Sequence, residues 1–329
     1  MATFDTRLPW GMDPKYESYV TGHGYASSTP AADESGIYVY YGAAGAMAYQ
    51  HDGKLKWHKS FEWRGKRCNT FNWGTGSSPV LFGELLIINA DPESGDVVAL
   101  DKATNREVWQ VPTTAESRSS PLLMQVKDRH ELVIHVNGGV RVKPREGKLA
   151  GIDPRTGKQL WECQALDNYL NPNPVAGNGV VYALGGYPGN AVAIRAGGQG
   201  DVTKSHLVWE AKHGSAVCTP VFFEDHLYWT NDASGIAYCV NAKTGTTVYE
   251  KRLEPRPDRI YASGIIADGK LYYVSREKGT YVLLAAPKYE VLAHNTFAAD
   301  ASVFNATPAV SRGQLLLRSD KYLYCIGRK

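Results

Sequence analysis

Three short stretches of the sequence contain residue types that form catalytic or metal sites in other proteins, but none has the required spacing. Residues 130–135 read H-E-L-V-I-H, so the second histidine comes one position later than in the H-E-x-x-H zinc motif, and residues 132–136 read as a strand. That motif places both histidines on one face of a helix. Residues 76–79 do not match the G-x-S-x-G elbow of a nucleophilic serine. The Gly-rich stretch 197–200 lacks the Lys-Ser/Thr pair that binds phosphate.

The cysteines do not have the spacing of a metal cluster or a disulfide framework. No two of them are spaced C-x-x-C, and their number is odd. Free cysteines behave as small apolar residues and are commonly buried. We therefore expect free, buried thiols and no metal ion. The five cysteines are Cys68, Cys163, Cys218, Cys239 and Cys325.

A third group of residues consists of arginine, asparagine and aromatic residues that lie in predicted loops. The guanidinium fork of arginine binds carboxylates, and aromatic faces stack on sugars and apolar groups. If the loops meet at one mouth, they predict a site for an anionic peptide or glycan. The alternative is that the arginines pair with Asp or Glu of neighbouring loops. The candidate ligand-binding residues are Arg67, Asn72, Trp73, Arg118, Asn137, Arg141, Tyr261 and Arg276.

A repeated turn indicates which elements would carry these loops. Asp101, Asp153 and Asn241 each precede an aromatic residue by eight positions, and Thr-Gly or Thr-Asn lies between them. An Asp or Asn side chain at the start of a turn accepts hydrogen bonds from nearby backbone N–H groups, and Gly or Asn tolerates positive φ. Residues 51–57 are a shortened copy. Each copy therefore predicts a hairpin whose second strand carries the aromatic residue.

A second repeated element precedes each hairpin and sets the number of units. It reads as small or polar residues, usually a proline, and then a strand, and its copies recur at intervals of roughly 40 to 55 residues, the period of a propeller or solenoid. Each interval contains four short strand-like runs. We predict one all-β domain over residues 1–329, a β-propeller of four-stranded antiparallel blades. Seven blades are favoured and eight are the alternative. The copies are residues 27–30, 77–80, 119–122, 171–174, 218–221, 262–265 and 306–309.

The two ends of the sequence suggest how such a ring would close. The last predicted strand, 322–326, is the third of its blade, and residues 2–10 form a strand-like run without a partner. A shared terminal blade removes an exposed sheet edge. We therefore predict that residues 2–10 form the closing outer strand of the last blade.

The repeat as a whole resembles the quinoprotein-like (PQQ-like) β-propeller repeat family. Residues 99–109, 150–161 (with one extra residue) and 238–249 resemble the pattern A-x-D-x-x-T-G-x-x-x-W. The resemblance covers nearly the whole chain and extends to bacterial exported repeat proteins and to the propeller lipoprotein of outer-membrane barrel assembly. It implies that the repeated aromatic residue docks between adjacent blades. These docking residues are Trp57, Trp109, Trp161, Trp209 and Tyr249.

The same resemblance raises the question of a PQQ cofactor. Family dehydrogenases that bind PQQ use two adjacent cysteines, a stacking tryptophan and acidic calcium ligands. This sequence has no adjacent cysteines and is much shorter than those enzymes. We therefore expect no PQQ and no other cofactor.

Composition excludes some classes of partner and leaves the compartment open. With 36 Lys and Arg against 33 Asp and Glu, the net charge is +3 and the basic residues are dispersed, so nothing favours nucleic acid. No apolar run is long enough to span a membrane. Met1 is followed by polar residues instead of a signal peptide. The protein is cytoplasmic if Met1 is native, and periplasmic or secreted if a leader has been removed. We expect a monomer.

Three functions remain compatible with these observations, because a propeller fold by itself decides none. The first is a non-catalytic scaffold that captures a protein or glycan at the mouth. The alternative is a lyase-type enzyme that abstracts a proton from a polysaccharide, with Tyr or His as base and Arg or Asn neutralising a uronate. PQQ-dependent oxidation is the least favoured.

Overall fold

The computed structural model describes residues 27–61, 74–113, 117–137 and 145–327. Within them the chain forms seven sheets, antiparallel except for the pairing of β16 (Gly200–Asp201) with β12 (Gln159–Leu166), and only short helical turns. The chain divides into two compact units. Unit 1 comprises Met1–Leu170 and Ala196–His206, and unit 2 comprises Asn171–Arg195 and Leu207–Lys329.

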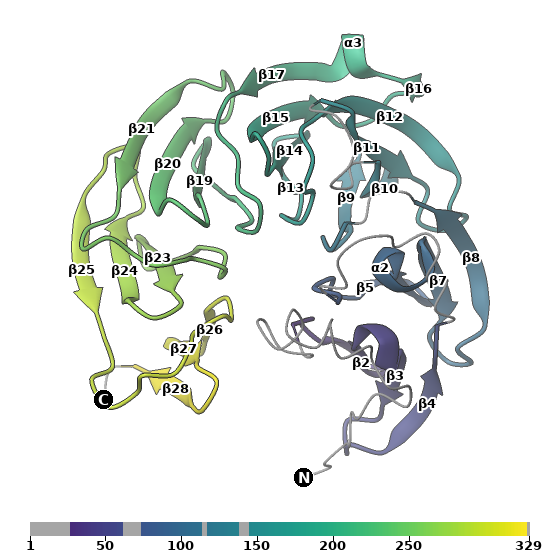
Figure 1. The fold of residues 1–329 in the computed structure, drawn as a ribbon. Helices are drawn as coiled ribbons and strands as arrows, with labels where there is room; N and C mark the ends of the chain where they lie inside the picture. Colours follow the sequence, from purple (N-terminus) through teal and green to yellow (C-terminus); the bar gives the residue numbers. More distant parts are fainter. Residues whose placement is uncertain (1–26, 62–73, 114–116, 138–144, 328–329) are drawn as a thin grey trace. The chain divides into compact units, whose positions relative to one another are not determined.

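Unit 1 contains the first three sheets, shown from purple to teal in Figure 1. The first consists of β1 (Ala31–Asp33), β2 (Gly36–Tyr40), β3 (Ala46–Tyr49) and β4 (Leu55–Lys59), with the 3-10 turn η1 (Gly42–Ala44). The second consists of β5 (Val80–Phe82), β6 (Leu85–Asn89), β7 (Asp96–Asp101) and β8 (Glu107–Pro112), with the helical turn α2 (Asp91–Ser94). The third consists of β9 (Leu122–Val126), β10 (Arg129–Asn137), β11 (Gly147–Ile152) and β12 (Gln159–Leu166), and is extended by β16 (Gly200–Asp201) before α3 (Thr203–His206).

Unit 2 contains the remaining four sheets. The fourth consists of β13 (Val175–Gly177), β14 (Val180–Gly185), β15 (Asn190–Arg195) and β17 (Leu207–Ala211). The fifth consists of β18 (Val221–Phe223), β19 (His226–Thr230), β20 (Ile236–Asn241) and β21 (Thr247–Arg252). The sixth consists of β22 (Ile265–Ala267), β23 (Lys270–Ser275), β24 (Gly279–Leu284) and β25 (Val291–Asn295). The seventh consists of β26 (Ala309–Ser311), β27 (Gln314–Arg318) and β28 (Leu323–Ile326).

Each sheet is one blade of a β-propeller, which confirms the predicted all-β fold class with seven blades in the described part of the chain. The first six blades run through four antiparallel strands in chain order, as predicted. Within its described residues the seventh blade has three strands. The predicted closing strand, residues 2–10, lies outside the described residues. The single-domain assignment stays a prediction, because the structure separates two units.

The core lies between neighbouring blades of the same unit. Tyr38 and Ala48 of the first blade pack with Leu86 and Val98 of the second, and other clusters join the second blade to the third, the fourth to the fifth and the fifth to the sixth. The middle strands are buried on both faces, so β7 and β15 read as nearly continuous apolar runs. Burial between blades, not within one, therefore stabilises each sheet.

The repeated hairpin has the predicted turn chemistry. The carboxylate of Asp101 accepts hydrogen bonds from the backbone N–H of Ala103 and Thr104 at 3.1 and 2.8 Å, and Asn241 does the same for its own turn. Asn105, where the other copies have glycine, has φ 57°, and Gly245 has φ 73°. Local side-chain bonds and one left-handed residue thus fix each turn.

The cysteines differ in part from the expectation. Cys163, Cys218 and Cys239 are free and buried, whereas Cys325 is free and exposed. Cys325 lies on β28, the last strand of its sheet in the described residues, and no described strand pairs with the outer side of β28. Cys68 lies outside the described residues.

Candidate functional site

The candidate ligand-binding residues are described only in part. Arg67, Asn72, Trp73 and Arg141 lie outside the described residues, and Asn137 is placed only by its backbone, at the end of β10. Arg118 belongs to unit 1, whereas Tyr261 and Arg276 belong to unit 2. The local surroundings of these three residues therefore define what is known of the site.

Arg118 is half-buried in the segment that leads into β9. Its Nε donates a hydrogen bond to the carbonyl oxygen of Gly74 at 3.0 Å, and its positive charge acts on the buried carboxylate of Glu93. This arrangement resembles the alternative considered for the arginines, in which they pair within the protein. At least part of the Arg118 charge is directed inward.

Glu93 belongs to an acidic cluster that the sequence did not reveal as a site. It lies on α2 with Asp91, and both side chains are buried. The Tyr40 hydroxyl donates to Glu93 Oε2 at 2.6 Å, which joins the first blade to the second. Burial raises the pKa of Glu93 to about 7, although the bond from Tyr40 and the charge of Arg118 oppose it. The signal in the sequence was D-P-E-S between two strands, which also fits an exposed turn.

The companion residue Asp91 is held by neutral donors. Thr113 Oγ1 donates to Asp91 Oδ1 at 2.6 Å, and the backbone N–H of Ser117 donates to Oδ2 at 2.8 Å. These bonds replace the water that burial removes. The two carboxyl groups of α2 therefore have different environments.

A buried histidine lies close to the same segment. His135 Nδ1 is 2.7 Å from Ser119 Oγ and 3.3 Å from Ser117 Oγ, and Ser117 Oγ donates to the carbonyl oxygen of Leu170 at 2.5 Å. Burial lowers the pKa of His135 to about 3, so the ring is neutral near pH 7. Ser119 and His135 are each only 3% exposed, so a substrate does not reach this Ser–His pair. Its geometry supports a structural role.

In unit 2, Arg276 lies over the ring of Tyr261. Its guanidinium carbon is 4.8 Å from the ring centroid, and Nε donates to Asn305 Oδ1 at 2.8 Å. Backbone bonds to Arg259 and Phe304 fix Arg276 on both sides. A guanidinium held over an aromatic face presents a planar, oriented donor. Because the ring face of Tyr261, not its hydroxyl, meets the arginine, these two residues do not form an acid–base pair.

The docking aromatic residues form a second, repeated set of contacts. The indole N–H of Trp57 donates to the carbonyl oxygen of Lys102 at 2.8 Å. Trp109 donates to Pro154 at 3.1 Å, and Trp209 donates to Ala242 at 2.8 Å. In each pair the tryptophan lies on the outer strand of one blade, and the carbonyl group lies in the repeated turn of the next blade. All three side chains are at most 9% exposed.

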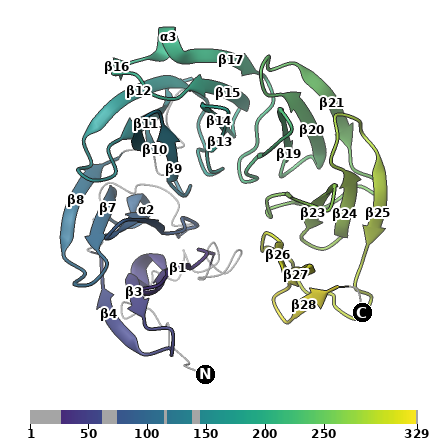
Figure 2. The same ribbon diagram turned by 180° about the vertical axis from the view of Figure 1, so that it is seen from behind.

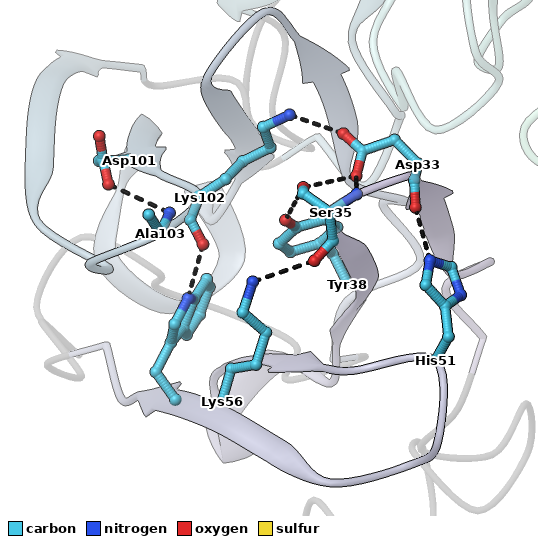
Figure 3. Close-up of polar contacts among 9 residues, drawn as sticks. Asp33, Ser35, Tyr38, His51, Lys56, Asp101, Lys102 and Ala103 are labelled. Atoms are coloured by element: carbon cyan, nitrogen blue, oxygen red, sulfur yellow. Dashed lines mark hydrogen bonds and ion pairs between the residues drawn. The ribbon is translucent and has the colours of Figure 1, made fainter.

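Figure 3 shows how charge reinforces the first of these contacts. Lys102 Nζ pairs with Asp33 Oδ2 at 2.6 Å, and Ser35 Oγ donates to Asp33 Oδ1 at 2.6 Å. Partial burial opposes ionisation of Asp33, but the bonds from Lys102 and Ser35 outweigh it and lower its pKa to about 2. Lys102 thus bonds Trp57 through its backbone and the first blade's opening hairpin through its side chain.

Trp161 and Tyr249 depart from this pattern. Trp161 donates to Glu131 Oε2 at 2.7 Å within its own blade, and Glu131 also pairs with Arg129 at 2.6 Å. The hydroxyl of Tyr249 has no hydrogen-bond partner in the described structure, and its ring meets that of Tyr289 edge-on at 5.5 Å. The repeated aromatic position is therefore buried in all five blades, but its polar contact varies.

Comparison with known proteins identifies the family of this chain. A family model described as "Outer membrane protein assembly factor BamB" matches residues 6–251. The chain belongs to the BamB family. A curated BamB of Marinobacter adhaerens is 28% identical over 137 residues, which are 41% of this chain and 32% of that relative. The matched part thus spans about a third of the relative's length.

Solved structures share the fold of this chain at low sequence identity. BamB from Moraxella catarrhalis has a TM-score of 0.69 at 14% identity, over 91% of this chain and 84% of that one. A europium-containing methanol dehydrogenase has a TM-score of 0.63 at 12% identity, over 88% and 73% of the two chains. In the described residues of the present chain, no helix is long and apolar enough to cross a membrane.

Proposed function

We propose that this protein is a non-catalytic, protein-binding propeller that acts in outer-membrane protein assembly. The observation that carries the proposal is the BamB family match over residues 6–251, together with the seven-blade fold in the described residues. Outer-membrane assembly implies a periplasmic site of action for this chain. The partner class is protein, and a glycan is the alternative that the test must separate.

The proposed binding residues are Arg118 of unit 1, Tyr261 and Arg276 of unit 2, and the predicted residues outside the described part. Arg276 is the strongest described candidate for binding the partner, because Tyr261 and Asn305 hold its guanidinium in a fixed orientation. Oriented guanidinium groups favour carboxylate-bearing partners. Arg118 is a weaker candidate, because Gly74 and Glu93 already engage it.

The lyase alternative receives no comparable support. It requires a base, either a tyrosine hydroxyl or a histidine ring nitrogen, beside a charge-neutralising arginine in an accessible pocket. The described candidate Tyr261 contacts Arg276 through its ring face, and His135, which is not one of the candidates, is buried. We therefore propose binding without catalysis and without a cofactor.

The cellular test is deletion of the gene in the source bacterium, followed by quantification of outer-membrane β-barrel proteins. We expect their levels to fall and to recover with the wild-type gene, and cell fractionation should place the protein in the periplasmic or envelope fraction. Unchanged barrel levels in the deletion strain would refute the proposed function.

A second experiment tests the binding surface directly. Calorimetry on acidic peptides and uronate-containing glycans would compare the wild type with the double variant Arg118→Ala, Arg276→Ala. We expect peptide binding that the double variant weakens at least tenfold. Exposed Arg312→Ala is the matched control and should bind as the wild type does. Binding of glycans alone would favour the glycan alternative, and no binding, or binding unchanged in the double variant, would refute this surface.

A further inference from the structure

The segment Ala196–His206, called the strap below, lies along the outer strand of the third blade. It stands where the repeated turn would otherwise connect β15 to β17, and it belongs to unit 1. Within it, β16 pairs in parallel with β12, with Gly200 opposite Trp161 and Asp201 opposite Glu162. Both views show β16 beside β12 (Figures 1 and 2).

Backbone and side-chain bonds attach the strap to the edge of β12. The N–H of Val202 donates to the carbonyl oxygen of Glu162 at 2.9 Å, and Thr203 Oγ1 accepts from the N–H of Gln164 at 3.0 Å. Val202 is 2% exposed, so the strap also contributes a buried apolar side chain. These contacts satisfy edge groups of β12 that would otherwise face solvent or another strand.

The strap is also bonded to Arg129 on β10, a strand further inside the same sheet. Arg129 donates to the carbonyl oxygen of Gly198 at 3.4 Å and pairs with Glu131, which accepts the indole N–H of Trp161. A side chain at Gly198 would meet Val202 at 2.8 Å, and φ there is +102°. The strap therefore has a compact, specific conformation over the blade.

The edge under the strap differs from the other outer edges. The strand β12 has eight residues, whereas β4, β8, β17, β21 and β25 have five or six. In the described residues no strand pairs with the outer side of those shorter strands. Short edge strands resist pairing with other molecules, and a long edge with apolar side chains does not. Cys163, Ala165 and Leu166 supply such side chains on β12.

We infer that the strap guards the β12 edge against strand pairing with a second copy of this chain. In the absence of the strap, the partner at this edge would be β12 of another molecule, because a long uncovered edge is complementary to itself in an antiparallel pair. The inference rests on the strap contacts and on the length of the β12 edge, and it does not depend on the proposed function. If the strap only stabilised its own blade, its removal would lower stability without causing association.

The test replaces residues 195–206 with a copy of residues 241–246, the short turn that connects β20 to β21. Light scattering after size-exclusion chromatography would measure mass against concentration for the wild type and this variant. We expect the variant's mass to reach at least twice the wild-type value as concentration rises, while the wild-type mass stays constant. Circular dichroism would show that the variant remains folded.

A second substitution identifies the associating edge. Gln164→Pro in the strapless variant removes the outward N–H that normally meets Thr203, and it should restore the wild-type mass. The matched control Glu250→Pro lies at an outer strand without a strap and should leave the association unchanged. A strapless variant that stays at the wild-type mass, or associates equally with Gln164→Pro, would overturn the inference.

If the transplanted turn prevents folding, Val202→Asp provides the same test with a smaller change. It places a charge at a buried position of the strap and leaves β12 intact. Faster hydrogen exchange at Gln164 would show release of the strap, and concentration-dependent mass is again expected. Release of the strap with constant mass would contradict the inference.

Discussion

At the scale of single residues, the buried carboxyl group of Glu93 stands out because it couples two blades through one hydrogen bond. Tyr40 of the first blade donates to it, and Asp91, Arg118 and Thr75 are the other groups that influence this pair. Burial without a full counter-charge disfavours the ionised form. Folding stability should therefore depend on pH through this residue.

Glu93→Gln is expected to remove that dependence. The pKa of Glu93 rises from 4.5 to about 7 on folding, so the folded state binds the proton more tightly. Its contribution is fully present below about pH 4.5 and is lost as pH rises through about 7. The shift corresponds to about 3 kcal/mol. Urea unfolding at pH 4.5 and pH 8 would measure the free energy of unfolding of both proteins.

In that comparison, the free energy of unfolding of the wild type should fall relative to that of Glu93→Gln as the pH rises from 4.5 to 8. Glu107→Gln, at an exposed position on β8, is the control. The difference between its free energy of unfolding and that of the wild type should stay constant over the same pH range. Equal pH profiles for the wild type and Glu93→Gln would show that Glu93 does not titrate as described.

At the scale of elements, the contact between a docking tryptophan and the next turn explains why glycine recurs in that turn. A Cβ on Gly245 would lie 2.7 Å from the ring of Trp209, and one on Gly157 would lie 2.9 Å from the ring of Trp109. In these two turns, positive φ and lack of space therefore both favour glycine, whereas Asn105 occupies the equivalent position in the turn that meets Trp57. The tryptophan and the glycine form one joint between two blades.

Gly245→Ala should cost more stability than Gly179→Ala. Both glycines have nearly the same φ, +73° and +74°, but nothing lies within 4 Å of a Cβ on Gly179. The backbone cost of about 1 kcal/mol is common to both. The displaced indole should add roughly 1–3 kcal/mol for Gly245→Ala. Thermal and urea unfolding would measure the difference, and equal destabilisation would mean that the indole contact contributes nothing.

At the scale of the whole molecule, closure is the open part of the fold prediction. The seventh blade has three strands in its described residues, and Leu323 and Ile326 on β28 are exposed. The sequence predicts residues 2–10 as its fourth strand, and these lie outside the described residues. The prediction therefore concerns an edge whose apolar side chains gain burial when it is paired.

Deletion of residues 1–10 should lower the melting temperature and the free energy of unfolding. A terminal blade without its outer strand exposes both backbone groups and apolar side chains to water. Differential scanning calorimetry on the full chain and the truncated chain would measure the effect. A deletion of residues 328–329 serves as the control and should be neutral. Unchanged melting after removal of residues 1–10 would contradict the closing-strand prediction.

Much of the fold was predictable because its signals are local. The Asp or Asn side chain, the left-handed Gly or Asn and the eight-residue spacing to an aromatic residue act within one hairpin. Such short-range chemistry determines a turn wherever it occurs in the chain. The second repeated element, with its seven copies, favoured seven blades, and the described residues contain seven sheets. Trp57, Trp109 and Trp209, at the repeated aromatic position of the hairpins, are buried.

The sequence by itself thus determined the blades and their turns, whereas the polar contacts between distant residues were decided only by tertiary structure. Glu131 accepts from Trp161, Tyr40 donates to Glu93, and the strap pairs in parallel with β12. Each of these contacts joins segments separated by many residues, and no spacing in the sequence encodes it. Burial makes each polar group take whichever partner the neighbouring strand or blade provides, because an unpaired polar group in the interior is costly.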